Sequence, residues 1–162
     1  MSSFPPPSSP RPSAPPSARP FRTLLSEHQG RDYDELDDGR GKVRIWHLQN
    51  RFCVFESSGS LHEQHAEFIV AYHARHIEAH PRPWFAFGNW MALKAYTPEV
   101  RRALTDWQVK QRYDGLYVAH DSRLLAMGLS VANGVLENTV KIVPNEEALD
   151  DILIEVRKQA RF

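Results

Sequence analysis

Residues 43–56 read VRIWHLQNRFCVFE, two short apolar runs separated by Gln49-Asn50. Short runs rich in β-branched and aromatic residues predict strands, and a connection of two residues is the length of a tight hairpin. In the second run, residues 52–55 are all apolar, so side chains on both faces of the strand are suited to burial. This pattern is typical of a strand inside a sheet that is covered on both sides.

Helix and strand signals alternate after this hairpin. Ser60-Leu61-His62-Glu63 matches a capping box, which predicts a helix from this point to about His80. Thr97 followed by Pro98 predicts a second helix with a threonine cap and a proline at its first position. The other expected elements are strands at 84–87, 116–119 and 139–143, a helix from Asp121 or Ser122 to Asn133, and a last helix from Asn145.

The expected order is a pair of strands, a helix, and then three strand-helix pairs. Strands that alternate with helices pair in parallel, and the helices pack on the sheet. We therefore predict an α/β fold with a mixed, mainly parallel sheet of about five strands and about four helices. It occupies residues 43–162 as a single domain, because a chain of 162 residues with 41% hydrophobic side chains can bury one ordinary core.

Residues 1–42 have a different composition. Residues 2–20 are dense in proline and serine and offer little to bury, which predicts a disordered tail. The acidic residues between positions 32 and 38 then lead into Gly39 and Gly41, and we interpret this stretch as a solvated linker. It lacks the ligand spacing and the closing glutamate of a calcium loop.

Charge and cysteine content limit the partners and the compartment. The chain has 20 basic and 20 acidic side chains, so there is no overall electrostatic reason to expect nucleic acid. No apolar run is long enough to span a bilayer, and we expect no membrane insertion. Cys53 is the only cysteine, which makes a reducing cytoplasm the expected location. Its place in a two-sided strand predicts a core thiol, because a reactive thiolate needs exposure and a cationic neighbour.

Three segments carry a resemblance to a known family: WFAFGNW at 84–90, YTPE at 96–99 and VKIVPNEEAL at 140–149. Together with the order of elements, they resemble the small bacterial STAS-like proteins, relatives of anti-sigma-factor antagonists and of the cytoplasmic domains of sulfate transporters. The resemblance covers residues 43–160 and omits the tail. It implies a non-enzymatic regulatory module that binds a partner protein and needs no cofactor.

The resemblance also implies a phosphorylated serine or threonine at the start of the second helix, where Thr97 is the nearest match. A phosphate there would lie on free backbone amides at the positive end of the helix. The phosphorylated antagonists carry an Asp-Ser pair before that helix and an aspartate after the third strand, whereas this chain has Tyr96-Thr97 and Gly88-Asn89. The alternative is that Thr97 is an ordinary helix cap.

A row of histidines lies on the first expected helix. At about 100° per residue, these side chains fall within an arc of roughly 80°. Within the row, His73, His76 and His80 have spacings at which two imidazoles can meet one metal ion. Apolar residues share the same angles, so the alternatives are neutral packing at the core edge or a pH-sensitive contact in a homodimer. The row consists of His62, His65, His73, His76 and His80.

Trp90 and Tyr96 follow the third expected strand, and Asp121 and Ser122 follow the fourth. Open α/β sheets hold ligands at the carboxyl ends of their strands, so these four residues form a candidate pocket for a small ligand or lipid. The alternative is that the aromatic rings close the core. The sequence contains no nucleophile elbow and no phosphate loop, so we expect no enzyme and name no catalytic residue.

The sequence therefore favours a cytoplasmic, STAS-like regulatory module that acts by protein interaction. The alternative function is a small metal- or ligand-binding protein that uses the histidine row. The two hypotheses differ in their dependence on metal. The second predicts a stoichiometric effect of zinc or nickel on thermal stability that is lost in His73→Ala/His76→Ala, and indifference to metal would exclude it.

Overall fold

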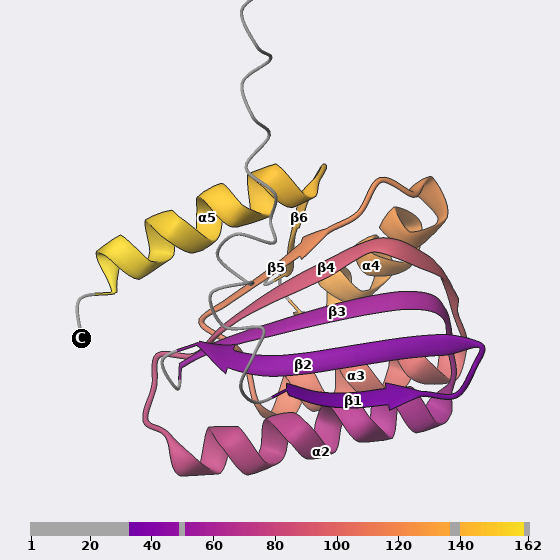
Figure 1. Ribbon diagram of the computed structural model, residues 1–162, viewed down its shortest axis with the longest axis horizontal. Coiled ribbons are helices and arrows are strands. Elements are labelled where there is room, and N and C mark those ends of the chain that lie inside the picture. The colour runs from indigo at the N-terminus through magenta and orange to yellow at the C-terminus, as the bar shows by residue number, and fades with distance from the viewer. Residues whose placement is uncertain (1–32, 49–50, 137–139, 161–162) are drawn as a thin grey trace, which may run out of the picture.

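The computed structural model describes residues 33–48, 51–136 and 140–160 (Figure 1). Within these residues, six strands form one sheet in which neighbours follow chain order. The strands are β1 Tyr33–Asp37, β2 Gly41–Leu48, β3 Phe52–Leu61, β4 Phe85–Tyr96, β5 Gly115–Ala119 and β6 Val140–Val143. The helices are α2 Glu63–Ala79, α3 Pro98–Lys110, α4 Arg123–Leu136 and α5 Glu146–Gln159.

The sheet is mixed and mainly parallel. Strands β1, β2 and β3 pair in antiparallel fashion, and β3 to β6 pair in parallel. The predicted α/β class and the predicted mixed sheet are confirmed, with one described strand more than the sequence indicated. The disordered tail that we predicted before residue 33 lies outside the described residues, as does the turn at Gln49-Asn50.

The additional strand is β1, which lies in the acidic stretch that we interpreted as a linker, so the predicted boundary at residue 43 is wrong. Its charges match those of β2: Oε2 of Glu35 lies 2.8 Å from Nη2 of Arg44, and Oδ2 of Asp37 lies 3.6 Å from Nζ of Lys42. The side chains of β1 are mostly exposed. An edge strand of this kind has no apolar alternation by which sequence could reveal it.

Helix α2 begins later than the predicted capping box at Ser60. Ser60 and Leu61 extend β3 instead, and the Ser60 amide donates to the Arg40 carbonyl at 2.9 Å. The N-cap is His62, whose amide donates to Nδ1 of His65 at 2.9 Å. His65 therefore satisfies the N-cap amide, as the third helical residue of a capping box does, but the box begins at His62 instead of Ser60.

The three later helices begin where the sequence predicted. In each case a polar side chain before the helix accepts a hydrogen bond from a first-turn amide, as an N-cap should. Strand β4 is longer than the predicted 84–87 because β3 pairs with it as far as Tyr96. The cap bonds are Val100 N to Thr97 Oγ1 (3.4 Å), Leu125 N to Ser122 Oγ (3.4 Å) and Ala148 N to Asn145 Oδ1 (2.8 Å).

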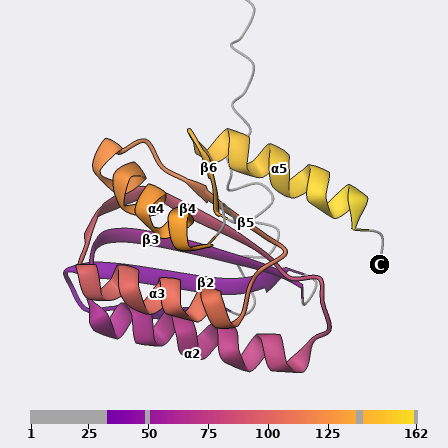
Figure 2. The same cartoon turned by 180° about the vertical axis from the view of Figure 1, so that it is seen from behind.

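Helices α2, α3 and α4 cover one face of the sheet and α5 covers the other (Figures 1 and 2). The larger hydrophobic cluster lies on the side of the three helices and includes Phe55 and Trp90. The smaller cluster lies on the side of α5 and includes Phe87 and Leu149. Cys53 belongs to the larger cluster as a buried free thiol, as predicted, and burial raises its pKa.

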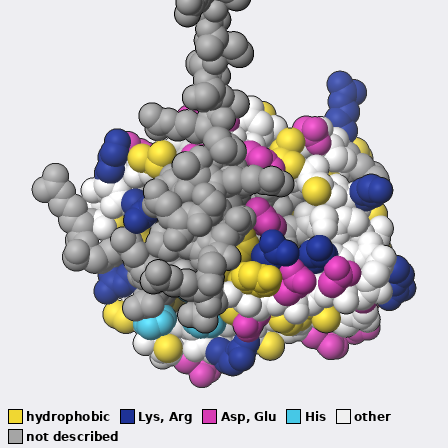
Figure 3. All heavy atoms as spheres, in the orientation of Figure 1, with side chains coloured by type: hydrophobic (Ala, Val, Ile, Leu, Met, Phe, Trp, Pro, Cys, Tyr) yellow, Lys and Arg dark blue, Asp and Glu magenta, His cyan; other side chains and the backbone are white. Residues whose placement is uncertain are grey.

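Ion pairs hold the edge of the sheet. On the face drawn in Figure 3, basic and acidic side chains are interspersed beside β1 and β2. Arg75 of α2 reaches Asp34 of β1, with 2.9 Å between Nη2 and Oδ2.

Among the described helices, none has the length and apolar character needed to cross a membrane.

Candidate functional site

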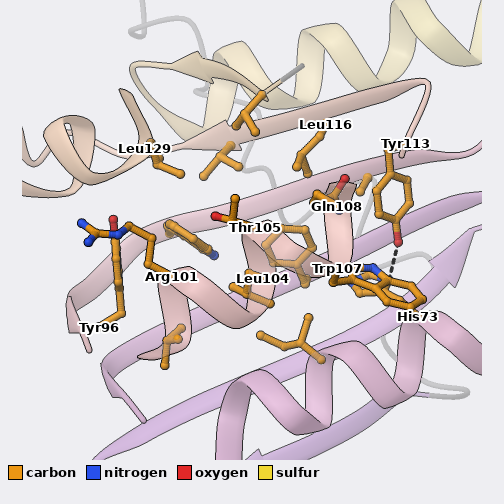
Figure 4. Close-up of a pocket in the computed structure, with 17 residues that line it drawn as sticks. His73, Tyr96, Arg101, Leu104, Thr105, Trp107, Gln108, Tyr113, Leu116 and Leu129 are labelled. Atoms are coloured by element: carbon orange, nitrogen blue, oxygen red, sulfur yellow. Dashed lines mark hydrogen bonds between the residues drawn. The ribbon is translucent and has the colours of Figure 1, made fainter. Parts of the chain in front are cut away.

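A cavity of about 80 Å³ lies between the sheet and helices α2, α3 and α4 (Figure 4). Residues of β3 to β6 line it on the sheet side, and α3 provides most of the helical wall. The exposed side chain of Arg101 belongs to this lining, so the cavity reaches the surface beside α3. The α3 side chains of the wall are Val100, Arg101, Leu104, Thr105, Trp107 and Gln108.

Three buried polar atoms in this lining have no hydrogen-bond partner among the described residues. They are Nε1 of Trp90, Nε1 of Trp107 and Oε1 of Gln108. Trp90 is 6% exposed and Gln108 is 8% exposed, so neither side chain is solvated from the surface. Leaving such a group unpaired costs about 1–3 kcal/mol, and the great majority of buried polar groups find a partner. The lining therefore offers hydrogen bonds that the described protein does not use.

The cavity has one charged end. In Figure 4, Tyr96 and Arg101 lie together at one end of the lining. Burial raises the pKa of Tyr96, and the positive charge of Arg101 acts in the opposite direction. Arg101 takes part in none of the ion pairs of the described residues. A cation without a carboxylate partner among the described residues thus lies at the edge of an apolar space.

The opposite end contains His73 and Tyr113 (Figure 4). His73 is 4% exposed, its Nδ1 meets the Tyr113 hydroxyl, and the same nitrogen lies 3.7 Å from Sγ of Cys53. Burial lowers the pKa of His73 to about 3 and raises the pKa of Tyr113. The phenol therefore keeps its proton and donates to Nδ1, which places the imidazole proton on Nε2. This end of the cavity is uncharged at neutral pH.

The histidine row is divided among separate environments. Nε2 of His65 lies 3.0 Å from the Gly41 carbonyl, and the His76 ring stacks on His47 with 4.1 Å between ring centroids. In the part of the chain that the structure describes, no group of three or more His, Cys, Asp or Glu side chains is placed to hold a metal ion. His73, His76 and His80 are thus not assembled as the predicted metal set. The row lies on the packing face of α2, where β2 and Tyr113 supply its partners.

The four predicted pocket residues are divided by the structure. Trp90 and Tyr96 line the cavity, whereas Asp121 and Ser122 are not among its lining residues. Ser122 caps α4, and Asp121 is exposed. The two pairs separate because β4 continues to Tyr96 at the start of α3, while α4 begins directly after β5 with its own cap.

Thr97 stands at the junction between β4 and α3. Its amide donates to the Leu61 carbonyl at 3.2 Å, and its hydroxyl accepts from the Val100 amide at 3.4 Å. The residue therefore acts as a helix cap. Because it precedes the helix that forms the cavity wall, a chemical change at Thr97 would act on the wall directly.

His120 is a further buried polar side chain. It follows β5, is 4% exposed, and neither ring nitrogen has a hydrogen-bond partner among the described residues. Burial lowers its pKa. It is not part of the cavity lining.

Sequence reasoning missed Arg101, Thr105 and Gln108. One signal for Gln108 was present: it lies four residues after Leu104, on the face of the expected helix that also carries Trp107. A glutamine on an apolar helix face predicts a buried amide that needs a partner. Arg101 and Thr105 carried no such signal, because polar residues at the border of a helix face are common.

Comparison with models of known protein families gives no match for this chain. A search among curated proteins also finds no matching relative. The class of protein is therefore defined by the fold and the site alone: an α/β domain with a mixed sheet and a small, mostly apolar cavity walled by α3.

Proposed function

We propose that this chain is a non-enzymatic binding module of STAS-like type that takes up a small, largely apolar molecule and thereby regulates its contact with a partner protein in the cytoplasm. The observation that carries the proposal is the cavity, whose apolar lining contains three buried polar atoms without described partners. Small-molecule sites are usually concave and apolar, with a few polar groups that fix the orientation of the ligand.

Helix α3 connects the cavity to the surface. Its inner side chains Leu104 and Gln108 line the cavity, while Val109 on the same helix is 47% exposed. A ligand that contacts Leu104 and Gln108 stabilises the position of α3 in which those contacts are made. The affinity of a partner that binds the exposed side of α3 then depends on that position. Occupancy and partner binding are then coupled through one helix.

The order of elements supports the STAS-like part of the proposal. An antiparallel pair, β2 and β3, is followed by α2 and by three strand-helix pairs, which is the order on which the resemblance rests. Thr97 begins the second helix of that series, where the resemblance implies a phospho-acceptor. A phosphate on Thr97 would lie beside the first-turn amides of α3 and would alter the same wall of the cavity.

Ligand uptake is tested by thermal unfolding of the full chain in the presence of 1-propanol, 1-butanol and 1-hexanol. A ligand that binds only the folded state stabilises it by about 2.7 kcal/mol at a hundredfold excess over Kd, so at least one probe should raise Tm in a saturable manner. The variant Leu104→Phe fills part of the cavity and should abolish the shift. Val118→Ile fills it from the sheet side and serves if Leu104→Phe does not fold.

The matched control is Val109→Phe, which adds the same ring on the exposed side of α3 and should retain the wild-type shift. If no probe raises Tm, or if Leu104→Phe and Val109→Phe respond like the wild type, the cavity is a packing defect and the proposal fails. The regulatory part fails if Thr97→Ala and Thr97→Glu, and a ligand that saturates the cavity, all leave the affinity for an identified partner unchanged.

A further inference from the structure

We infer that the natural ligand of the cavity is a small monocarboxylate, with its carboxylate at the Tyr96 and Arg101 end and its apolar body beside Leu104. This inference rests on the proposed function, since it names the chemical class of the molecule that the cavity takes up. It is carried by two features of the lining: the charge at its Arg101 end and the small apolar space behind that charge.

The charge of the lining selects an anion. Arg101 is the one formally charged side chain that lines the cavity in the described chain, and no aspartate or glutamate is part of the lining. His73, at the other end, is neutral because burial lowers its pKa to about 3. Arg101 also lacks an ion pair with any described carboxylate. A ligand with an ammonium group would meet a like charge at the mouth, whereas a carboxylate would complete an ion pair there.

The unused hydrogen bonds favour an acceptor group. Two of the three unpartnered atoms are indole N–H groups, which can only donate. Carboxylate oxygens only accept, and they accept from several donors at once. The third atom belongs to the Gln108 amide, whose oxygen and nitrogen are interchangeable by rotation, so the side chain can present either group. A carboxylate beside Arg101 therefore matches the guanidinium, whereas Trp107 and Gln108 lie toward the His73 end of the lining (Figure 4) and do not bear on where the carboxylate lies.

The size of the cavity limits the apolar body. An apolar cavity of about 150 Å³ admits a benzene molecule, and the volume here is about 80 Å³. A short alkyl chain that enters from the surface beside Arg101 fits this space, with its first carbons near Tyr96 and its end near Leu116 and Val118. Long acyl chains would require α3 to move outward. The enclosed part of the body is thus a short alkyl segment, and the rest of the ligand lies in the opening beside Arg101.

The test compares hexanoate with 1-hexanol, which has the same chain and no charge, in NMR titrations of the full chain at pH 7. We expect hexanoate to bind about two- to fivefold more tightly, the range that corresponds to one partly exposed ion pair. Arg101→Gln should reduce this ratio to about one. The matched control is Arg102→Gln, because Arg102 is the exposed neighbour that does not line the cavity and should retain the preference.

Each result separates this inference from the proposed function. If both compounds bind equally and Leu104→Phe blocks both, the cavity binds small molecules but the carboxylate class is wrong. If the preference for hexanoate persists in Arg101→Gln, or is lost equally in Arg102→Gln, the assigned position of the carboxylate is wrong. If neither compound binds, while 1-propanol or 1-butanol raises Tm as described above, only the present inference fails. If no probe binds, both fail.

Discussion

His73 places a neutral imidazole in the core, and this makes the stability of the protein depend on pH. Its Nδ1 accepts from Tyr113, and burial lowers its pKa to about 3 from an ordinary 6.5. Between these two pH values the unfolded state binds a proton that the folded state does not. The free energy of unfolding therefore falls as the pH falls from 6.5 toward 3, by at most about 1.4 kcal/mol per pH unit for one histidine.

We predict that His73→Phe has a lower free energy of unfolding than the wild type at pH 7. On acidification, its free energy of unfolding should fall less steeply than that of the wild type. His47 has a pKa lowered to about 3 by burial and by the neighbouring His76, so part of the slope remains in the variant. Urea unfolding at pH 7, 6 and 5 measures the slope. Tyr113→Phe removes the hydroxyl and keeps the titrating histidine, and it should retain most of the wild-type slope. Equal slopes for His73→Phe and the wild type would contradict the assignment of a neutral, buried His73.

The histidines also show what sequence can predict at the scale of the residue. Helical periodicity placed them on the packing face of α2, and His65 and His73 are buried there. Their partners were not predictable, because Tyr113 is 40 positions away from His73 and the Gly41 carbonyl is 24 positions away from His65. A local pattern reports which face is buried, whereas the partner depends on how distant elements meet.

At the scale of the element, α4 contains two glycines with opposite expected effects. A Cβ at Gly134 would meet nothing within 4 Å, whereas a Cβ at Gly128 would collide with the Tyr96 hydroxyl. Alanine is better than glycine in a helix by about 1 kcal/mol. We predict that Gly134→Ala raises the free energy of unfolding by about 0.5–1 kcal/mol, and that Gly128→Ala lowers it by about 1 kcal/mol or more.

Urea unfolding of both variants checks this prediction, and Tyr96→Phe provides the control. In Gly128→Ala/Tyr96→Phe the hydroxyl that would meet the new methyl group is absent, so part of the lost stability should return. A double mutant that is no more stable than Gly128→Ala would show that α4 and Tyr96 are not in contact. Because Tyr96 lines the cavity, the close approach of α4 to this ring also fixes one end of the site.

The cap at Thr97 is a second prediction for an element. The hydroxyl accepts from the Val100 amide at 3.4 Å, and removal of such a cap typically costs about 1 kcal/mol. We expect Thr97→Ala to lower the free energy of unfolding by about this amount, and Thr97→Ser to remain within a few tenths of the wild type. Equal stability of Thr97→Ala and the wild type would mean that the amide finds another acceptor, and the cap would then be free for a different role.

Three helix starts were predictable, whereas the cap of α2 and strand β1 were not, for a physical reason. Thr97 and Asn145 act within one turn of chain, so the residues that cause the helix start are contiguous in sequence. Strand β1 is held by residues far from it, since Glu35 pairs with Arg44 and Asp34 pairs with Arg75. The same holds for the cavity, whose walls come from β3 to β6 and from three helices.

At the scale of the whole molecule, β1 protects the edge of the sheet. Its turn is tied by Asp38, which accepts from the Gly41 amide at 2.9 Å and from Gln64 of α2 at 2.7 Å. The hydrogen bond from the Gly41 amide first, and then those from Arg40, lower the pKa of Asp38. Without β1, the backbone of β2 would be unpaired along its outer side. An unpaired strand that carries buried apolar residues is a template for association.

We predict that a chain of residues 41–162 unfolds at a lower temperature than residues 33–162 and associates as its concentration rises. Residues 41–162 lack the ion pairs at Arg44 and Arg75 and leave the edge of β2 unpaired. This strand carries Ile45 and Trp46, which are 0% and 4% exposed in the intact domain. Thermal unfolding and light scattering at two concentrations measure both effects. Residues 33–162 with Glu35→Gln and Asp34→Asn form the control, because the edge stays paired while its ion pairs are weakened. If that control associates like residues 41–162, the charges of β1 protect the edge of the sheet; if it stays monomeric, the pairing of β1 with β2 protects it. Equal Tm and equal mass for residues 41–162 and 33–162 would show that β1 neither stabilises the domain nor prevents its association.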